Sequence, residues 1–179
     1  MSELNVNDVL PIVRRAAEIG CITSTALFAG VALAYNCIII PGLKEASSEV
    51  GESTRHWGVH YEKGKNTQIK LIAGSALTGA LATYLGSPRA FLYAGGIIAL
   101  NAPYTLLCIM PTNAKLLDLG KQITNLEKKG DSGEKGKKEK VDKEREASVL
   151  IEHWTKLHSV RTVLGISAVA LIGYAFTKN

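Results

Sequence analysis

Four long apolar stretches separated by polar connections dominate the pattern of this chain. The stretches contain no charged residue, and they lie between Glu18 and Lys44, Lys70 and Arg89, Arg89 and Lys115, and Arg161 and Lys178. A membrane-spanning helix needs roughly 20 mostly apolar residues, with about 17 as a minimum. The pattern therefore predicts an all-α integral membrane four-helix bundle in a single domain, with spans near residues 17–40, 69–85, 90–110 and 160–176.

The second and fourth stretches are close to the lower length limit, so Arg89, Arg161 and Lys178 must reach the lipid headgroups with their long side chains. A soluble bundle with unusually apolar helices is the alternative, and the length of the stretches disfavours it. The first stretch follows Arg14 and Arg15, as a secretory signal would. It is longer than the roughly 7–15 apolar residues of a signal, and we interpret it as an uncleaved span.

The histidines and tryptophans are unevenly distributed along the chain. All of them fall in the first or third polar connection or in its immediate flanks: His56, Trp57, His60, His153, Trp154 and His158. In a protein with four spans, these two connections emerge on the same face of the bilayer. The sequence therefore predicts a site on that face.

Lysine and arginine are concentrated beside the same two connections, whereas the opposite face has Arg14, Arg15, Arg89 and Lys178. The positive-inside rule places the connections in the cytosol and both termini on the far side. We expect a multi-pass protein of an internal, endoplasmic-reticulum-like membrane, although the arginine pair beside the first span weighs against this orientation.

The third connection contains a long charged insert, residues 127–145, composed almost entirely of Lys, Glu, Gly and Asp. Such a segment has little apolar surface to bury, and we expect it to be disordered and dispensable. Helix should resume near Ala147.

The third span contains Asn101 and Pro103. Proline removes a backbone donor and typically kinks a helix, and an amide at membrane depth needs a hydrogen-bond partner. The combination is compatible with a cavity between helices, and equally with a structural kink satisfied by neighbouring hydroxyls.

The remaining composition excludes several classes of function. The chain has a net charge of +5, but the basic residues are not interleaved with aromatic ones as in a nucleic-acid groove, and no nucleotide-binding loop is present. The cysteines all lie in apolar stretches and form no disulfide framework. His56 and His60 could join the other histidines at a metal, but no known ligand signature is present, and we expect none.

The remaining candidate site consists of His158, Arg161 and Trp154, and we expect residues of the first connection to lie close to it. A neutral imidazole accepts a proton near pH 7, and a guanidinium one turn away can stabilise an oxyanion. Such a group would suit a planar, weakly acidic aromatic substrate. The simpler alternative, an interfacial belt of aromatic residues and cations, is favoured by the residue types alone.

Four segments together resemble the fungal anthrone oxygenase-like membrane family, of the noranthrone monooxygenase type. They are Trp57–Gly64, Asn101–Thr105, Met110–Leu116 and Trp154–Arg161. The resemblance implies a small four-span protein that oxidises polyketide anthrones to anthraquinones with molecular oxygen and without a cofactor. The long charged insert departs from the compact pattern of the family.

The resemblance also implies roles for the residues of the matching segments. His158 is the first candidate for the base and His60 the second, and Arg161 and Asn113 are candidates for binding the oxyanion. The substrate contacts would come from Trp57, Tyr61, Trp154 and Asn101. The expected partners are membrane lipid, a hydrophobic aromatic small molecule and oxygen. The competing hypothesis is a non-catalytic membrane scaffold.

Overall fold

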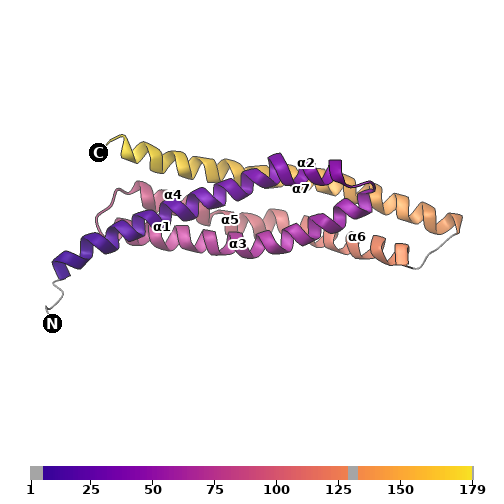
Figure 1. The fold of residues 1–179 in the computed structure, drawn as a ribbon, viewed down its shortest axis with the longest axis horizontal. Helices are drawn as coiled ribbons and strands as arrows, with labels where there is room; N and C mark the ends of the chain where they lie inside the picture. The colour runs from indigo at the N-terminus through magenta and orange to yellow at the C-terminus, as the bar shows by residue number, and fades with distance from the viewer. Residues whose placement is uncertain (1–5, 129–132, 179) are drawn as a thin grey trace. The chain divides into compact units, whose positions relative to one another are not determined.

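The computed structural model describes residues 6–128 and 133–178, and within them every regular element is helical (Figure 1). In chain order the elements are α1 (Val6–Ala34), η1 (Tyr35–Ile39), α2 (Ile40–Ala46), α3 (Val50–Tyr84), α4 (Ala90–Ala99), α5 (Asn101–Tyr104), η2 (Thr105–Ile109), α6 (Met110–Lys128) and α7 (Glu134–Phe176). The predicted all-α bundle is confirmed.

Three helical segments are long and apolar enough to cross a membrane: Val9–Ala46, Ala90–Lys128 and Glu134–Phe176. They contain three of the four predicted spans and indicate a membrane protein. The span predicted at residues 69–85 lies in α3 and is not among them. Because α3 ends at Tyr84, its charge-free part, from Leu71, is shorter than the roughly 17 residues that a span needs. Four passes therefore stay a prediction.

The chain folds into two compact units. Unit 1 comprises residues 1–32, 66–103 and 161–179, and unit 2 comprises residues 33–65 and 104–160. The helices α1, α3 and α7 contribute to both units, so each unit combines segments from distant parts of the sequence.

Unit 1 has an apolar core built from α1, α3, α4 and α7 around Phe28, Phe91 and Ile98. Its helices approach closely at Gly95, where an added Cβ would lie 2.8 Å from the carbonyl oxygen of Ser75. The buried hydroxyls of Thr25 and Ser75 hydrogen-bond to each other at 2.7 Å. Small residues and shared hydroxyls are the usual means of helix association in lipid.

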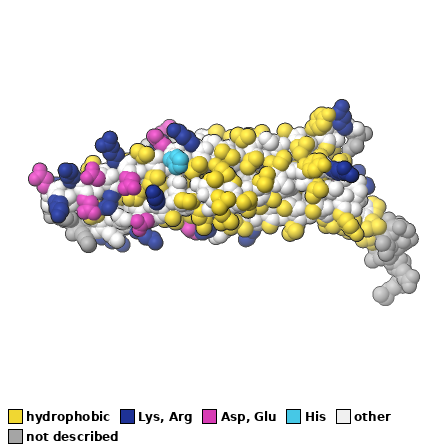
Figure 2. All heavy atoms as spheres, turned by 180° about the vertical axis from the view of Figure 1, so that it is seen from behind, with side chains coloured by type: hydrophobic (Ala, Val, Ile, Leu, Met, Phe, Trp, Pro, Cys, Tyr) yellow, Lys and Arg dark blue, Asp and Glu magenta, His cyan; other side chains and the backbone are white. Residues whose placement is uncertain are grey.

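Outside the core, unit 1 exposes many large apolar side chains. Leu77, Ile69 and Val163 are 72, 59 and 63 % exposed. Figure 2 shows many exposed hydrophobic side chains on the face that it draws. A soluble protein rarely exposes so much apolar surface, whereas lipid would cover it.

Unit 2 contains two π-helical turns, η1 and η2. In these turns the amides of Ile40 and Met110 bond to the carbonyls of Tyr35 and Thr105, five residues earlier. The second turn begins two residues after Pro103, so the predicted disturbance of this helix is present as a π-helical turn. Such turns insert one extra residue and re-aim the side chains beside them, often at functional sites.

The charged insert is helical in its second part, since residues 134–145 belong to α7, whereas its composition favours disorder. The Lys140 ammonium lies 2.7 Å from Glu49, 3.4 Å from Glu127 and 3.8 Å from Glu144. The Gly51 amide donates to the Glu144 carboxylate at 3.2 Å. Ionic contacts with the other connection replace the apolar burial that the insert lacks. Residues 129–132 lie outside the described residues.

Candidate functional site

The first and third connections meet in unit 2. The indole rings of Trp57 (α3) and Trp154 (α7) have centroids 5.6 Å apart and are nearly perpendicular, at 85°. Trp57 and Trp154 are 1 % and 2 % exposed. Two tryptophans that are almost a hundred residues apart in the sequence thus form one buried contact.

Each tryptophan also stacks on an aromatic residue four positions later in its own helix. Tyr61 lies parallel to Trp57, with centroids 5.3 Å apart and 3° between the planes. His158 stacks on Trp154 at 4.6 Å and 21°. The i, i+4 spacing places both partners on one helix face.

Tyr35, the first residue of η1, completes this arrangement. Its ring lies 5.2 Å from His158 and 5.8 Å from Trp154. We call Tyr35, Trp57, Tyr61, Trp154 and His158 the aromatic cluster. His158 is 1 % exposed, so the imidazole is enclosed by aromatic faces instead of lying at a wet membrane interface.

The position of Tyr35 is fixed by α3. Its hydroxyl donates to the backbone carbonyl of His60 at 2.5 Å. One turn later Gly64 faces the same hydroxyl, and an added Cβ at Gly64 would overlap the phenol. Glycine is therefore required at position 64 for Tyr35 to reach the His60 carbonyl.

Asn113 of α6 links the cluster to a third helix. The Trp154 indole N–H donates to Asn113 Oδ1 at 2.7 Å, and Asn113 is 2 % exposed. Two further donors, Asn113 Nδ2 and Trp57 Nε1, are buried and have no hydrogen-bond partner among the described residues. Buried donors are almost always satisfied in proteins, so this pair is well suited to an acceptor that arrives with a ligand.

The second candidate base is placed differently. The imidazole of His60 is exposed, and only its backbone carbonyl contacts the cluster. His56 and His153 are also exposed. The structure thus distinguishes His158 from the other three histidines by burial and by ring contacts.

The structure does not gather the histidines into a metal-binding group among the described residues. The side chains that lie close enough together to share an ion are Glu49, Glu127 and Glu144, and the Lys140 ammonium contacts all three. The same ammonium lowers the pKa of the Glu49 carboxyl below its usual 4.5 by donating a hydrogen bond to it. We interpret this group as an ionic contact.

Two predicted site residues belong to unit 1. Arg161 follows His158 by three residues in α7, is 7 % exposed and holds its guanidinium 5.3 Å from the ring centroid of Phe28. Asn101 is fully buried at the start of α5, and its amide donates to the carbonyl of Ile98 in α4 at 3.0 Å. The Asn101 side chain is therefore partly satisfied by nearby backbone carbonyls, whereas the structural alternative considered for the kink named neighbouring hydroxyls.

Sequence reasoning missed two tyrosines. Tyr35 belongs to the aromatic cluster, and the Tyr104 hydroxyl donates to the backbone carbonyl of Leu157 at 2.9 Å, one residue before His158. The sequence signal that could have found them is their position inside the first and third charge-free stretches. A tyrosine hydroxyl at membrane depth needs a hydrogen-bond partner.

The fold and this site define a class: a helical membrane protein with a histidine buried among aromatic rings. The chain belongs to the anthrone oxygenase family, whose model matches residues 57–171. The match begins at Trp57 and includes Asn113, Trp154 and His158. The chain is also 27 % identical over 157 residues to an anthrone oxygenase of Claviceps purpurea (strain 20.1), which covers 86 % of this chain and 83 % of that protein. No solved structure matches the chain.

Proposed function

We propose that the protein oxidises a polyketide anthrone to the corresponding anthraquinone with molecular oxygen and without a cofactor. The anthrone methylene lies between two aromatic rings opposite a carbonyl, so loss of one proton gives a delocalised, electron-rich anion. The anion passes one electron to oxygen, and the resulting radical and superoxide combine to a peroxide. Loss of water then leaves one oxygen atom as the new carbonyl, while the other departs with the two methylene hydrogens.

The observation that carries this proposal is the burial of His158 against Trp154 and Tyr35 in a chain of this family. A positioned imidazole is the usual general base near neutral pH. The flat faces of Trp57, Tyr61 and Trp154 suit a planar tricyclic substrate, and a site that excludes water favours formation of a delocalised anion.

Proton loss from an anthrone places negative charge on its carbonyl oxygen, and this oxyanion needs donors. Asn113 Nδ2 and Trp57 Nε1 are buried donors beside the aromatic cluster that have no acceptor among the described residues. Donors already in place, with no reorganisation to make, are the most effective form of oxyanion stabilisation. We assign the oxyanion to these two groups and keep Arg161 as the cationic partner proposed from the sequence.

A hydrophobic anthrone partitions into lipid. The helices that are apolar enough to cross a membrane would hold the site close to the substrate dissolved there. We place the protein in an internal, endoplasmic-reticulum-like membrane, where it would take substrate from the bilayer.

The direct test is oxygen uptake by the purified protein with emodin anthrone, with anthraquinone formation followed by absorbance. His158→Gln should slow turnover by about 10²–10⁴-fold, the usual contribution of a general base. His153→Gln is the matched control, because this exposed histidine lies on the same helix, and it should retain full activity. Equal activity of the two variants would exclude His158 as the base, and absence of anthrone-dependent uptake in the wild type would support the scaffold.

The oxyanion assignment has its own test at Asn113. Asn113→Asp keeps an acceptor for the Trp154 indole but removes the Nδ2 donor, so turnover should fall while the fold is retained. Arg161→Lys should also lower turnover, because a planar fork is replaced by a point charge. Asn113→Asp at wild-type activity would leave Asn113 with a packing role only.

A further inference from the structure

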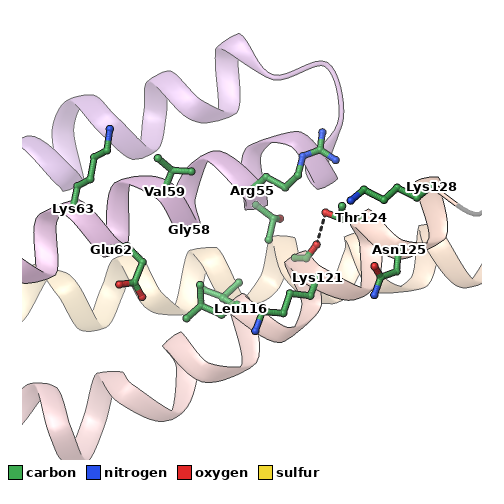
Figure 3. Close-up of a pocket in the computed structure, with 13 residues that line it drawn as sticks. Arg55, Gly58, Val59, Glu62, Lys63, Leu116, Lys121, Thr124, Asn125 and Lys128 are labelled. Atoms are coloured by element: carbon green, nitrogen blue, oxygen red, sulfur yellow. Dashed lines mark hydrogen bonds between the residues drawn. The ribbon is translucent and has the colours of Figure 1, made fainter.

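A groove of about 770 Å³ runs between α3 and α6 of unit 2, outside the aromatic cluster (Figure 3). Apolar side chains line it, among them Val59, Leu116 and Leu117. Gly58 and Gly120 also line it and, having no side chains, leave room in the groove. The Thr124 hydroxyl in the groove donates to the Gly120 carbonyl of its own helix at 2.8 Å (Figure 3). The groove therefore presents mainly an apolar surface.

The rim of the groove is cationic. Arg55 and Lys63 on α3, and Lys121 and Lys128 on α6, line it together with a single acidic residue, Glu62. Arg55 pairs with Glu127, and Glu62 pairs with Lys65 at 2.8 Å.

The two lysines of α6 that line the groove are available to a ligand. Lys121 and Lys128 are exposed and form no ion pair with the described residues. Seven residues separate them, so they lie on the same face of α6, about 10 Å apart along its axis. In Figure 3 both side chains lie along the groove, Lys121 toward Leu116 and Lys128 toward Thr124.

The groove adjoins surface that lipid would cover. Leu106 and Leu107 in η2 are 61 and 77 % exposed, and Met110 begins α6 nearly two helical turns before Leu116, its first groove residue. The apolar stretch ends at Pro111, and the first charged residues of α6 are Lys115 and Asp118. The groove therefore lies where an apolar lipid-facing surface changes to a charged one, which is the level of lipid headgroups.

We propose that this groove binds an anionic phospholipid, with an acyl chain along Val59 and Leu117 and the phosphate at Lys121 and Lys128. The ligand chemistry is an apolar chain joined to a phosphate, which matches an apolar wall beside the exposed ammonium groups of Lys121 and Lys128. Anionic phospholipids are concentrated in the cytosolic leaflet, and basic pockets between membrane helices on that side bind their headgroups. The positive-inside expectation places the groove on the same side.

The test uses the full chain in detergent, titrated with dioleoyl phosphatidic acid or dioleoyl phosphatidylcholine and observed by native mass spectrometry. Phosphatidic acid should bind more tightly. Each lysine near a phosphate is worth about fivefold in affinity, so Lys121→Gln with Lys128→Gln should weaken binding by about 30-fold. The control pair, Lys115→Gln with Lys156→Gln, removes the same charge from exposed lysines of unit 2 that do not line the groove, and it should change affinity by less than about twofold.

A second variant tests the apolar half of the groove. Gly58→Leu fills the groove without changing its charge and should reduce binding as strongly as the lysine pair, with circular dichroism confirming the fold. Equal binding of both lipids, or equal loss in the control pair, would overturn the proposal. Complete competition by glycerol 3-phosphate would indicate a site for free phosphate instead, and a cross-link between groove residues of two copies would assign the groove to self-association.

Discussion

The contact between Gly64 and Tyr35 gives the sharpest test of how the site is built. Gly64→Ala would place a methyl group against the Tyr35 phenol, 2.9 Å from Cζ and 3.1 Å from Cε2, and closer still to the hydroxyl. Real Cβ atoms do not approach this closely, so the phenol must move. Its hydrogen bond to the His60 carbonyl would then lengthen or break.

The expected change in the free energy of unfolding combines two destabilising contributions and one stabilising contribution. Overpacking costs about 1–3 kcal/mol, and loss of the hydrogen bond costs about 1 kcal/mol more. Replacing glycine by alanine inside a helix returns about 1 kcal/mol. We expect a net destabilisation of about 1–3 kcal/mol. Because the Tyr35 ring packs on His158, turnover should fall together with stability.

The assay is reversible unfolding in mixed detergent micelles, monitored by tryptophan fluorescence. Gly58→Ala is the matched control on the same helix, because its methyl group would meet Leu117 at an ordinary 3.5 Å. This control should be stabilised by about 0.5–1 kcal/mol through helix propensity. If Gly64→Ala were as stable as Gly58→Ala, the described position of Tyr35 would be wrong.

Three other predictions follow from single contacts. Gly95→Ala should destabilise unit 1 by about 2 kcal/mol or more, because its Cβ would collide with the Ser75 carbonyl. The control Gly96→Ala should not destabilise it, because its Cβ would meet nothing within 4 Å. Thermal unfolding of the two variants measures the difference. Ser75→Ala removes the Thr25 hydrogen bond and should cost about 0.5–2 kcal/mol in the same assay. Lys140→Met should lower stability at pH 7 and have less effect as the pH falls below 4.5, because the lowered pKa of Glu49 contributes stability that is lost once this carboxyl is protonated. A stability loss independent of pH would show that the ion pair is irrelevant.

The sequence determined the elements and the membrane character of the chain, because both depend on local composition. A charge-free run such as residues 19–43 specifies an apolar helix wherever it packs. The sequence also determined which residues share a helix face, since Trp57 with Tyr61 and Trp154 with His158 follow from the spacing of four. The parity of the connections predicted only that these two pairs would lie on one face of the bilayer.

Only the tertiary structure decided which side chains are enclosed. His60 and His158 look alike in the sequence, yet one imidazole is exposed and the other is buried between Trp154 and Tyr35. Tyr35 reaches the site because its hydroxyl donates to the His60 carbonyl on α3 and because Gly64 has no side chain that would collide with the phenol. The acceptor and the glycine both lie on α3, so the sequence around Tyr35 gives no sign of them.

The charged insert shows the same division. Its composition correctly indicated that it has little apolar surface to bury, but its order depends on partners elsewhere in the chain. The Lys140 ammonium and the Glu144 carboxylate bind Glu49 and the Gly51 amide of the first connection. Composition determines what a segment can bury, whereas long-range ionic and hydrogen-bond partners, which only the folded chain brings together, decide whether it is ordered.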